Sequence, residues 1–234
     1  MIQNIRYFNL RKIHLHSLYF SDIVIMNFAR KYEGGLDLVW DLDNIVGKGR
    51  GVEVGVFRGF FSKDILKLWQ GGTLFMVDVW KKMEDDYNDV CNNDDHMKYL
   101  RDTCDNVQGF EDRAIIIRST SEMAATLFPD ESLDFVYIDA NHAYEHVKKD
   151  IEIWYPKVRK GGVFAGHDYI NIDWYADPNF LPNMKDKHLY NTVNGEKYYN
   201  GVFGVNPAVD EFCEKYGYTL DVTTEWWGTW WIIK

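Results

Sequence analysis

The sequence has few basic residues for its length. Its 234 residues carry 26 Lys and Arg against 36 Asp and Glu, which gives a formal net charge of −10. A nucleic acid or an anionic membrane normally binds to a basic face of a protein. The shortage of positive charge therefore argues against both kinds of partner.

Cysteines and long apolar runs are also scarce. Cys91, Cys104 and Cys213 are an odd number without C-x-x-C spacing, so neither a disulfide framework nor a zinc site is indicated. The most apolar early segment, SLYFSDIVIMNF, is interrupted by Asp22 and is too short to span a membrane. The amino end lacks the pattern of a cleavable signal peptide. We expect a soluble, cytoplasmic protein with reduced thiols.

The stretch GVEVGVFRGFFS, residues 51–62, organises the chain. A short apolar run carrying Glu53 is followed by Gly55 and Gly59 and then by a helical pattern, which predicts a strand, a tight turn and a helix. Glycine allows positive φ and a close approach of a ligand. Glu53 would repel a phosphate but attract a cationic amino acid moiety or a ribose hydroxyl. The turn therefore favours a nucleoside with little or no phosphate.

Strand and helix patterns alternate along the rest of the chain. This order predicts a parallel sheet with right-handed crossovers, helices on both faces, and ligands at the carboxyl ends of the strands. We expect strands at residues 51–54, 73–80, 113–119, 133–139 and 161–169, and helices at 35–49, 61–69, 96–106, 123–128, 143–154 and 207–217.

Several details of these elements are predicted from residue spacing. Leu36, Val39, Leu42 and Val46 recur at helical spacing and should face inward from the helix at 35–49.

The segment STSE at 119–122 fits a capping box with Ser119 as the cap. The segments YTLDVTT and TWWIIK predict two terminal strands around a turn at Gly228, and such a pair must include antiparallel pairing. The neighbouring EWWGTWW is typical of core on a two-sided strand, or of a platform for stacking sugars.

Polar side chains gather at the predicted strand ends. They are Glu53, Asp78, Asp139, His167 and Asp168. Asp78 lies 19 residues after Gly59, close to the spacing at which an acid on the second strand meets a ribose. Because carboxyl ends of parallel strands meet at one edge of a sheet, these side chains should lie together.

Three segments of the sequence resemble the class I S-adenosylmethionine (SAM) methyltransferases. They are the glycine turn, SLDFVYIDANHAYEHVKKDI and GGVFAGHDY. More narrowly, they resemble the branch known as methyltransferase family 24, close to sugar and small-molecule O-methyltransferases. The resemblance implies an α/β, Rossmann-like fold with a mostly parallel seven-stranded sheet and an antiparallel carboxyl-terminal strand pair. It also implies an enzyme that methylates a hydroxyl of a sugar, a glycan or another small polar acceptor.

The resemblance divides a single domain into four parts and assigns the cofactor site. The parts are a helical segment at 1–49, the SAM-binding core at 50–169, an acceptor-side insertion at 170–203, and a terminal helix and strand pair at 204–234. The residues that would contact SAM are Glu53, Gly55, Phe57, Gly59 and Ser62 at its methionine and ribose portion, Asp78 at the ribose hydroxyls, Thr120 and Ser121 near the adenine, and Asp139.

The resemblance also places Asp139, His167 and Asp168 at metal positions, with magnesium or manganese as the ion. Here the sequence departs from metal-dependent relatives, because His167 replaces a carboxylate and Asn141 stands where a second aspartate is common. Hard cations prefer oxygen ligands, so a metal-free reaction stays open. In that case His142 or His167 would act as the base, beside Asp139.

Two other functions stay open. Tyr144 and Lys148 form a Y-x-x-x-K pair like that of short-chain dehydrogenases, although an NAD(P) oxidoreductase would also need a glycine-rich phosphate turn near its amino end. A SAM-binding fold can also serve as a non-catalytic partner protein. A homo-oligomer is compatible with the sequence.

Overall fold

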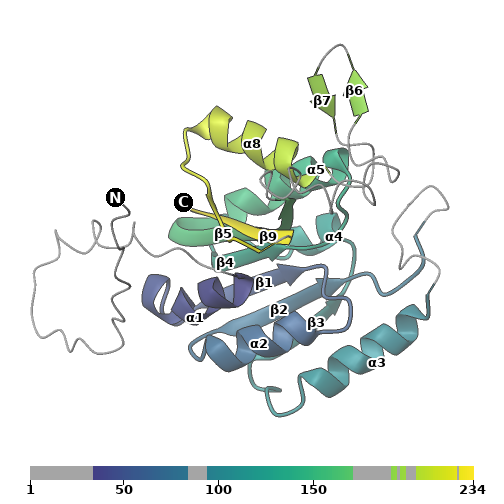
Figure 1. Ribbon diagram of the computed structural model, residues 1–234. Coiled ribbons are helices and arrows are strands. Elements are labelled where there is room, and N and C mark those ends of the chain that lie inside the picture. The colour runs from purple at the N-terminus through teal and green to yellow at the C-terminus, as the bar shows by residue number, and fades with distance from the viewer. Residues whose placement is uncertain (1–33, 84–93, 171–190, 194–195, 199–203, 226) are drawn as a thin grey trace, which may run out of the picture. The chain divides into compact units, whose positions relative to one another are not determined.

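The computed structural model describes residues 34–83, 94–170, 191–193, 196–198, 204–225 and 227–234 (Figure 1). All of them belong to the unit Tyr32–Lys234. The amino-terminal segment up to residue 33 and most of the predicted 170–203 insertion lie outside the described residues. Among the described residues, no helix is both long and apolar enough to cross a membrane.

Seven strands form one sheet in the order β3-β2-β1-β4-β5-β9-β8. They are β1 Arg50–Val54, β2 Thr73–Asp78, β3 Ala114–Arg118, β4 Leu133–Ile138, β5 Val158–Ile170, β8 Asp221–Val222 and β9 Trp227–Ile233. Strands β1 to β5 pair in parallel, whereas β9 runs antiparallel to β5 and β8. The predicted sheet, with its antiparallel carboxyl-terminal pair, is confirmed. A separate antiparallel pair consists of β6 Asn191–Val193 and β7 Glu196–Tyr198.

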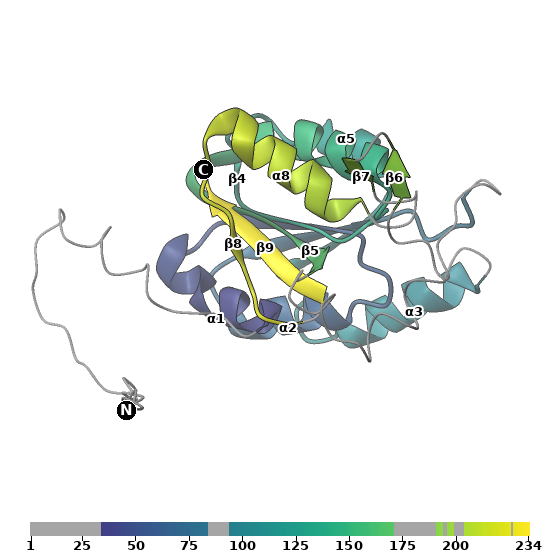
Figure 2. The same ribbon diagram turned by 45° about the horizontal axis from the view of Figure 1, so that its top comes forward.

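Helices cover both faces of the sheet, as Figure 2 shows. They are α1 Gly35–Ile45, α2 Phe60–Leu68, α3 His96–Asn106, α4 Ser121–Ala125, α5 Tyr144–Trp154 and α8 Val205–Tyr216, with a 3₁₀ turn, η2, at Tyr155–Lys157. One apolar core contains residues of α1 and α2, and the other contains residues of α4, α5 and α8. Side chains of one strand alternate between them: in β4, Phe135 and Tyr137 join the first core while Val136 and Ile138 join the second.

The prediction that Leu36 faces inward from α1 is wrong. Its side chain is 48% exposed, whereas Leu38 is fully buried. The first turn of α1 approaches the sheet through Gly35, where an added Cβ would lie 2.5 Å from the Thr229 hydroxyl oxygen. Glycine thus occupies the inward position of this turn, and an apolar residue one position later points to solvent.

Two further details differ from the sequence-based expectations. Thr120, and not Ser119, caps α4 by accepting a hydrogen bond from Met123 N at 3.3 Å. Ser119 directly follows β3, and its N–H donates to Asp78 O at 2.9 Å.

Gly228 lies inside β9 opposite Tyr169 and does not form the predicted turn. A Cβ there would come within 2.9 Å of Tyr169 O, so close packing of backbones explains the glycine. Further along β9, Trp230 and Trp231 are buried, as expected for a core strand.

Candidate active site

An irregularity in β5 brings two consecutive side chains to one place. Pairing with β9 passes from Gly166 opposite Trp230 to Tyr169 opposite Gly228, so β5 carries one extra residue. Such a β-bulge interrupts the alternation of side chains along a strand. Asp168, within this bulge, has a φ of +60°, which is uncommon for a residue other than glycine. His167 and Asp168 therefore both approach the end of β4, where a regular strand would separate them.

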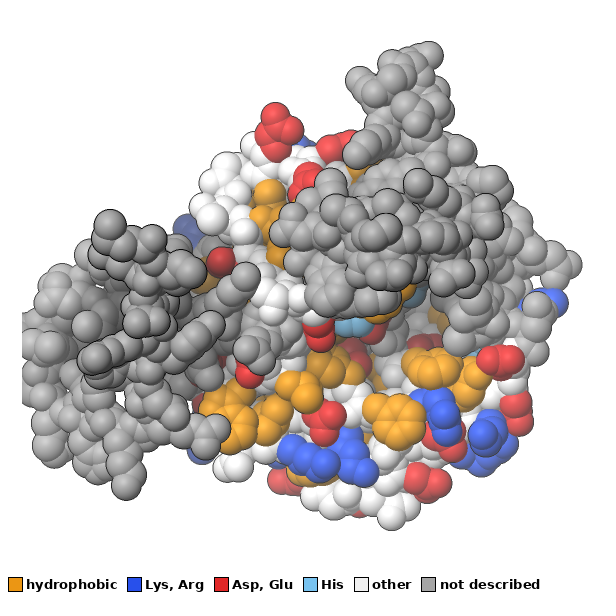
Figure 3. Space-filling view, in the orientation of Figure 1, with side chains coloured by type: hydrophobic (Ala, Val, Ile, Leu, Met, Phe, Trp, Pro, Cys, Tyr) orange, Lys and Arg blue, Asp and Glu red, His pale blue; other side chains and the backbone are white. Residues whose placement is uncertain are grey.

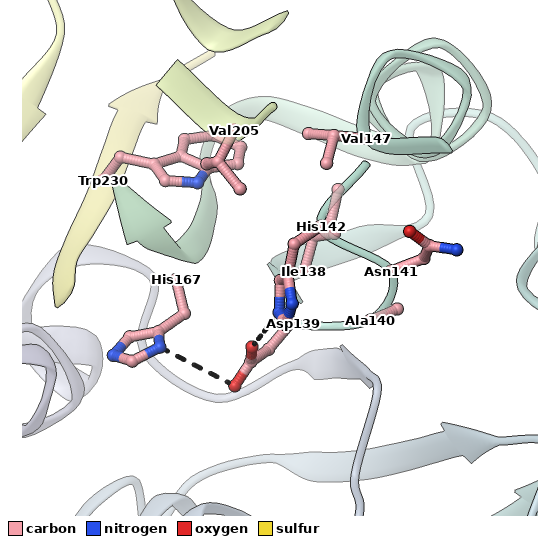
Figure 4. A pocket seen from close by; sticks show the side chains of 9 residues that line it. All are labelled: Ile138, Asp139, Ala140, Asn141, His142, Val147, His167, Val205 and Trp230. Atoms are coloured by element: carbon pink, nitrogen blue, oxygen red, sulfur yellow. Dashed lines mark hydrogen bonds and ion pairs between the residues drawn. The ribbon is translucent and has the colours of Figure 1, made fainter. Parts of the chain in front are cut away.

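At the end of β4 these two residues meet Asp139 and His142, and we call the four side chains the histidine–aspartate cluster. His142 Nε2 lies 2.8 Å from Asp168 Oδ2 and 3.4 Å from Asp139 Oδ1. His167 Nδ1 lies 3.1 Å from Asp168 Oδ1 and 3.9 Å from Asp139 Oδ2. The Asp139 carboxylate lies between the two imidazoles (Figure 4). Each histidine therefore contacts both carboxylates.

The cluster shifts the pKa values of its members. Burial lowers the pKa of His142, but hydrogen bonds to Asp139 and Asp168 outweigh it and raise the pKa to about 10. Burial also lowers the pKa of His167, and the hydrogen bond to Asp168 and nearby negative charges raise it above its usual value. Burial raises the pKa of Asp168, yet the two histidines together hold it well below its usual range. At neutral pH the cluster thus contains an imidazolium at His142 and a carboxylate at Asp168.

The cluster has an accessible rim and a buried interior. The side chains of Asp139 and His167 are 33% and 31% exposed, against 12% for Asp168. A histidine and neighbouring carboxylates are visible in the middle of the described surface (Figure 3). A small hollow beside the cluster is lined on its other side by apolar residues, among them Val147, Val205 and Trp230 (Figure 4). A ligand that reaches the site would therefore meet Asp139 and His167 first.

Three members of the cluster could hold a cation. One atom each of Asp139, His142 and Asp168 lie within 4.8 Å of one another. This set contains His142 where the sequence resemblance places His167. The signal for His142 was present in the sequence, because it follows Asp139 by three residues at a predicted strand end.

The glycine turn lies directly against this cluster. Gly55, with a φ of +91°, packs on the chain after β4, and an added Cβ would lie 1.9 Å from Asp139 O. Gly59, with a φ of +73°, packs on α3, where a Cβ would lie 3.0 Å from Thr103 Cα. The predicted strand, turn and helix are confirmed. The close approach that the glycines allow is, in this structure, an approach of the protein's own backbone.

Asp78, predicted to meet a ribose, also holds the turn. Its Oδ2 accepts hydrogen bonds from Val56 N at 3.0 Å and from Phe57 N at 2.9 Å, and its Oδ1 accepts one from Trp80 N at 2.8 Å. Burial raises the pKa of Asp78, while these backbone hydrogen bonds oppose that rise. Phe57, with a φ of +55°, leaves its side chain 42% exposed. The turn and the end of β2 therefore form one hydrogen-bonded unit.

Glu53 and Ser62 lie beneath the turn. Glu53 is only 2% exposed, and its carboxyl group accepts a hydrogen bond from the Ser62 hydroxyl. Burial raises the pKa of Glu53 well above its usual value. The pair joins β1 to the first turn of α2, and its predicted contact with a ligand stays a prediction.

Thr120 and Ser121 begin α4 at the end of β3. The Ser121 hydroxyl donates to Asp150 and accepts a hydrogen bond from Trp154 Nε1 at 2.8 Å. Burial raises the pKa of Asp150 to about 6. Sequence reasoning missed this buried acid, because its position on α5 gives no signal until the partner helix is known.

The Y-x-x-x-K pair does not join the cluster through its hydrogen bonds. Tyr144 donates to Glu211 of α8 at 2.7 Å, and Lys148 lies 2.9 Å from the Tyr144 hydroxyl and 3.2 Å from Glu211. The pair thus links α5 to α8 at the protein surface.

A family model described as a methyltransferase domain matches residues 52–169. A search of curated protein sequences gave no significant match.

Solved structures share the fold at low identity. An O-methyltransferase from Bacillus cereus in complex with S-adenosylhomocysteine (SAH) is 14% identical, with a TM-score of 0.52 and coverage of 85% of this chain and 80% of that one. The O-methyltransferase TomG from Streptomyces achromogenes, in complex with SAM, is 13% identical, with a TM-score of 0.54 and coverage of 85% and 78%.

Proposed function

Since the chain belongs to the methyltransferase family whose domain model matches residues 52–169, we propose that it transfers the methyl group of SAM to a hydroxyl oxygen of a sugar or another small polar acceptor. The observation that carries the proposal is the contact between the glycine turn and the histidine–aspartate cluster, where Gly55 packs on Asp139. Open α/β sheets bind ligands at this edge. A methyl donor at the turn and a hydroxyl at the cluster would meet there.

The donor would bind at the turn and at Asp78. A carboxylate offers about four acceptor positions. Three of those of Asp78 receive the N–H groups of Val56, Phe57 and Trp80. The remaining position suits one ribose hydroxyl. The Bacillus and Streptomyces neighbours, which were solved with SAH and SAM, support a donor of this class.

His167 is the better placed base. In its neutral form the imidazole donates from Nδ1 to Asp168 Oδ1 at 3.1 Å, and Nε2 can accept a proton. The acceptor proton passes to Nε2 while the hydroxyl oxygen bonds to the methyl carbon and the sulfur–carbon bond breaks, releasing SAH. His142, which the sequence indicates as the base with His167 as the alternative, lies between two carboxylates and has a pKa of about 10. It holds the carboxylates together and is a poor proton acceptor at neutral pH.

A divalent cation fits the residues present. Asp139, His142 and Asp168 supply two carboxylates and an imidazole whose atoms lie within 4.8 Å of one another. Two carboxylates that converge repel each other, and either a proton on His142 or a cation relieves that repulsion. The mixed oxygen and nitrogen set suits manganese better than magnesium. When bound, the cation would act as a Lewis acid that lowers the pKa of an acceptor hydroxyl.

The rim of the cluster supports the proposed acceptor class. Asp139 and His167 present hydrogen-bonding groups at the accessible side, which suits a hydroxyl-rich molecule such as a sugar. A sugar hydroxyl is hardly ionised at neutral pH, so a positioned base is worth about 10²–10⁴-fold in rate.

The experiment that tests the proposal is mass detection of an added methyl group. The protein and SAM are incubated with a panel of sugars and catechols, and SAH binding is measured in parallel by calorimetry. We expect SAH binding and methylated sugars. Methylation of catechols alone would contradict the sugar class, and binding of SAH without any product across the panel would favour a non-catalytic role. Failure of SAH binding would overturn the proposal as a whole.

A further inference from the structure

Helix α3 presents a polar face to the glycine turn. Tyr99, Asp102, Thr103 and Asn106 recur at spacings of three and four residues, so they lie on one side of the helix. Thr103 is the only fully buried residue of α3. Tyr99 and Leu100 of α3 also pack against the first core, so this face holds the helix together with partly buried apolar side chains.

Two side chains of this face bind backbone carbonyls of the turn. The Thr103 hydroxyl lies between Tyr99 O of its own helix, at 2.9 Å, and Phe57 O, at 3.2 Å. Phe57 O also accepts a hydrogen bond from Trp80 Nε1 at 2.8 Å. Asn106 Nδ2 donates to Arg58 O at 3.0 Å. Consecutive carbonyls of the turn thus point toward α3.

Side-chain contacts extend this attachment. Arg58 Nε lies 2.7 Å from Asp102 Oδ2, and the rings of Phe57 and Tyr99 have centroids 4.3 Å apart. A φ of +55° is strained for a residue as bulky as Phe57, and such a conformation persists only where its surroundings fix it. The contacts with α3 and Trp80 supply that constraint from one side, while Asp78 supplies it from the other.

We infer that α3 holds the glycine turn in the conformation that binds the methyl donor, with Thr103 and Asn106 as positioning residues. This inference rests on the proposed binding of SAM at the turn. Without the two side chains, Phe57 loses part of the constraint that keeps its φ positive. The peptide groups of the turn then rotate, and the N–H groups of Val56 and Phe57 leave Asp78. Donor affinity falls, whereas neither Thr103 nor Asn106 has a described hydrogen bond to the histidine–aspartate cluster.

The test compares Thr103→Val, Asn106→Leu and the double variant with the wild type. Both changes preserve size and remove a hydrogen-bond donor. Cys104→Ser, at an exposed neighbour on the same helix, is the matched control, and Thr103→Ser restores the hydroxyl. We expect the dissociation constant of SAH to rise roughly tenfold in the double variant, as for the loss of one or two modest hydrogen bonds. The KM for SAM should rise with it while kcat changes little.

Amide hydrogen exchange gives a second measurement that needs no ligand. Exchange at Val56 and Phe57 should accelerate in the double variant and stay unchanged in Cys104→Ser. A lower melting temperature with unchanged SAH affinity and unchanged exchange at these amides would overturn the inference. If the wild type fails to bind SAH, the proposed function fails, and faster exchange would still show that α3 holds the turn.

Discussion

His142 and His167 both contact Asp168, but they occupy different positions in the cluster. Each directs one ring nitrogen toward both carboxylates, but the distances to Asp168 and Asp139 are shorter for His142 Nε2, at 2.8 and 3.4 Å, than for His167 Nδ1, at 3.1 and 3.9 Å. The side chain of His167 is also more exposed, at 31% against 22%. The same residue type is therefore suited to hold charge at one position and to exchange a proton at the other.

We predict that His167→Ala lowers turnover of a sugar acceptor by about 10²–10⁴-fold, because the positioned base is lost. SAH affinity should stay near the wild-type value, since no described contact joins His167 to the glycine turn. His146→Ala, an exposed histidine on α5, serves as the control. Steady-state kinetics and calorimetry check the result. Near-normal turnover would move the base to another group of the cluster.

Removal of divalent cations should also lower turnover, and manganese should restore it. Manganese should raise the melting temperature of the wild type by binding only the folded state. Asp168→Asn should abolish that rise, because it removes one of the clustered carboxylates. Glu152→Gln, at an exposed acid of α5, should retain it. Full activity after exhaustive chelation, without any response to manganese or magnesium, would exclude the cation from the reaction.

At the scale of elements, the glycine turn and the end of β4 are held together by direct backbone contacts. Asp139 N donates to Val54 O at 2.7 Å, and the next residue, Gly55, packs on Asp139 O. The turn that would bind the donor and the loop that carries Asp139 are therefore fixed by the same contacts.

Gly55→Ala and Gly109→Ala form a matched pair that tests the packing of Gly55 on Asp139. Both glycines have similar positive φ values, +91° and +88°, but Gly109 has no atom within 4 Å of an added Cβ. We expect Gly109→Ala to lower the free energy of unfolding by about 1–2 kcal/mol, because alanine is strained at this positive φ. Gly55→Ala should cost about 4 kcal/mol or more, because the Asp139 backbone must also move. Urea unfolding measures both, and equal costs would show that packing at Gly55 is unimportant.

At the scale of the whole described unit, a buried acid makes stability depend on pH. Asp150 is 6% exposed and shares the Ser121 hydroxyl with Trp154, so it joins α5 to α4 beneath the second core. Its pKa is about 6 in the folded protein, against an ordinary value of 3.8. Between these values the folded state binds more protons than the unfolded state. The contribution of Asp150 to stability is therefore largest below pH 4 and declines as the pH rises through 6.

We predict that Asp150→Asn removes this decline. Relative to the wild type, the variant should gain stability between pH 4 and pH 7, by up to roughly 3 kcal/mol for a pKa shift of about two units. The difference between the two urea-unfolding curves at each pH isolates Asp150 from the other groups. Asp112→Asn, at an exposed carboxyl group, is the control. If the difference in unfolding free energy stays constant across this pH range, Asp150 is not the source of the pH dependence.

The sequence by itself determined the order of strands and helices, the glycine turn and the strand ends that carry Asp78, Asp139, His167 and Asp168. Hydrophobic periodicity and glycine placement are local signals, and local signals survive without the fold. Only the tertiary structure decided which side chains meet. The extra residue in β5 turns both His167 and Asp168 toward Asp139, and strand periodicity does not predict a bulge. The buried Asp150 and the polar face of α3 likewise acquire their partners from segments distant in sequence, because hydrogen bonds across the fold depend on packing and not on spacing.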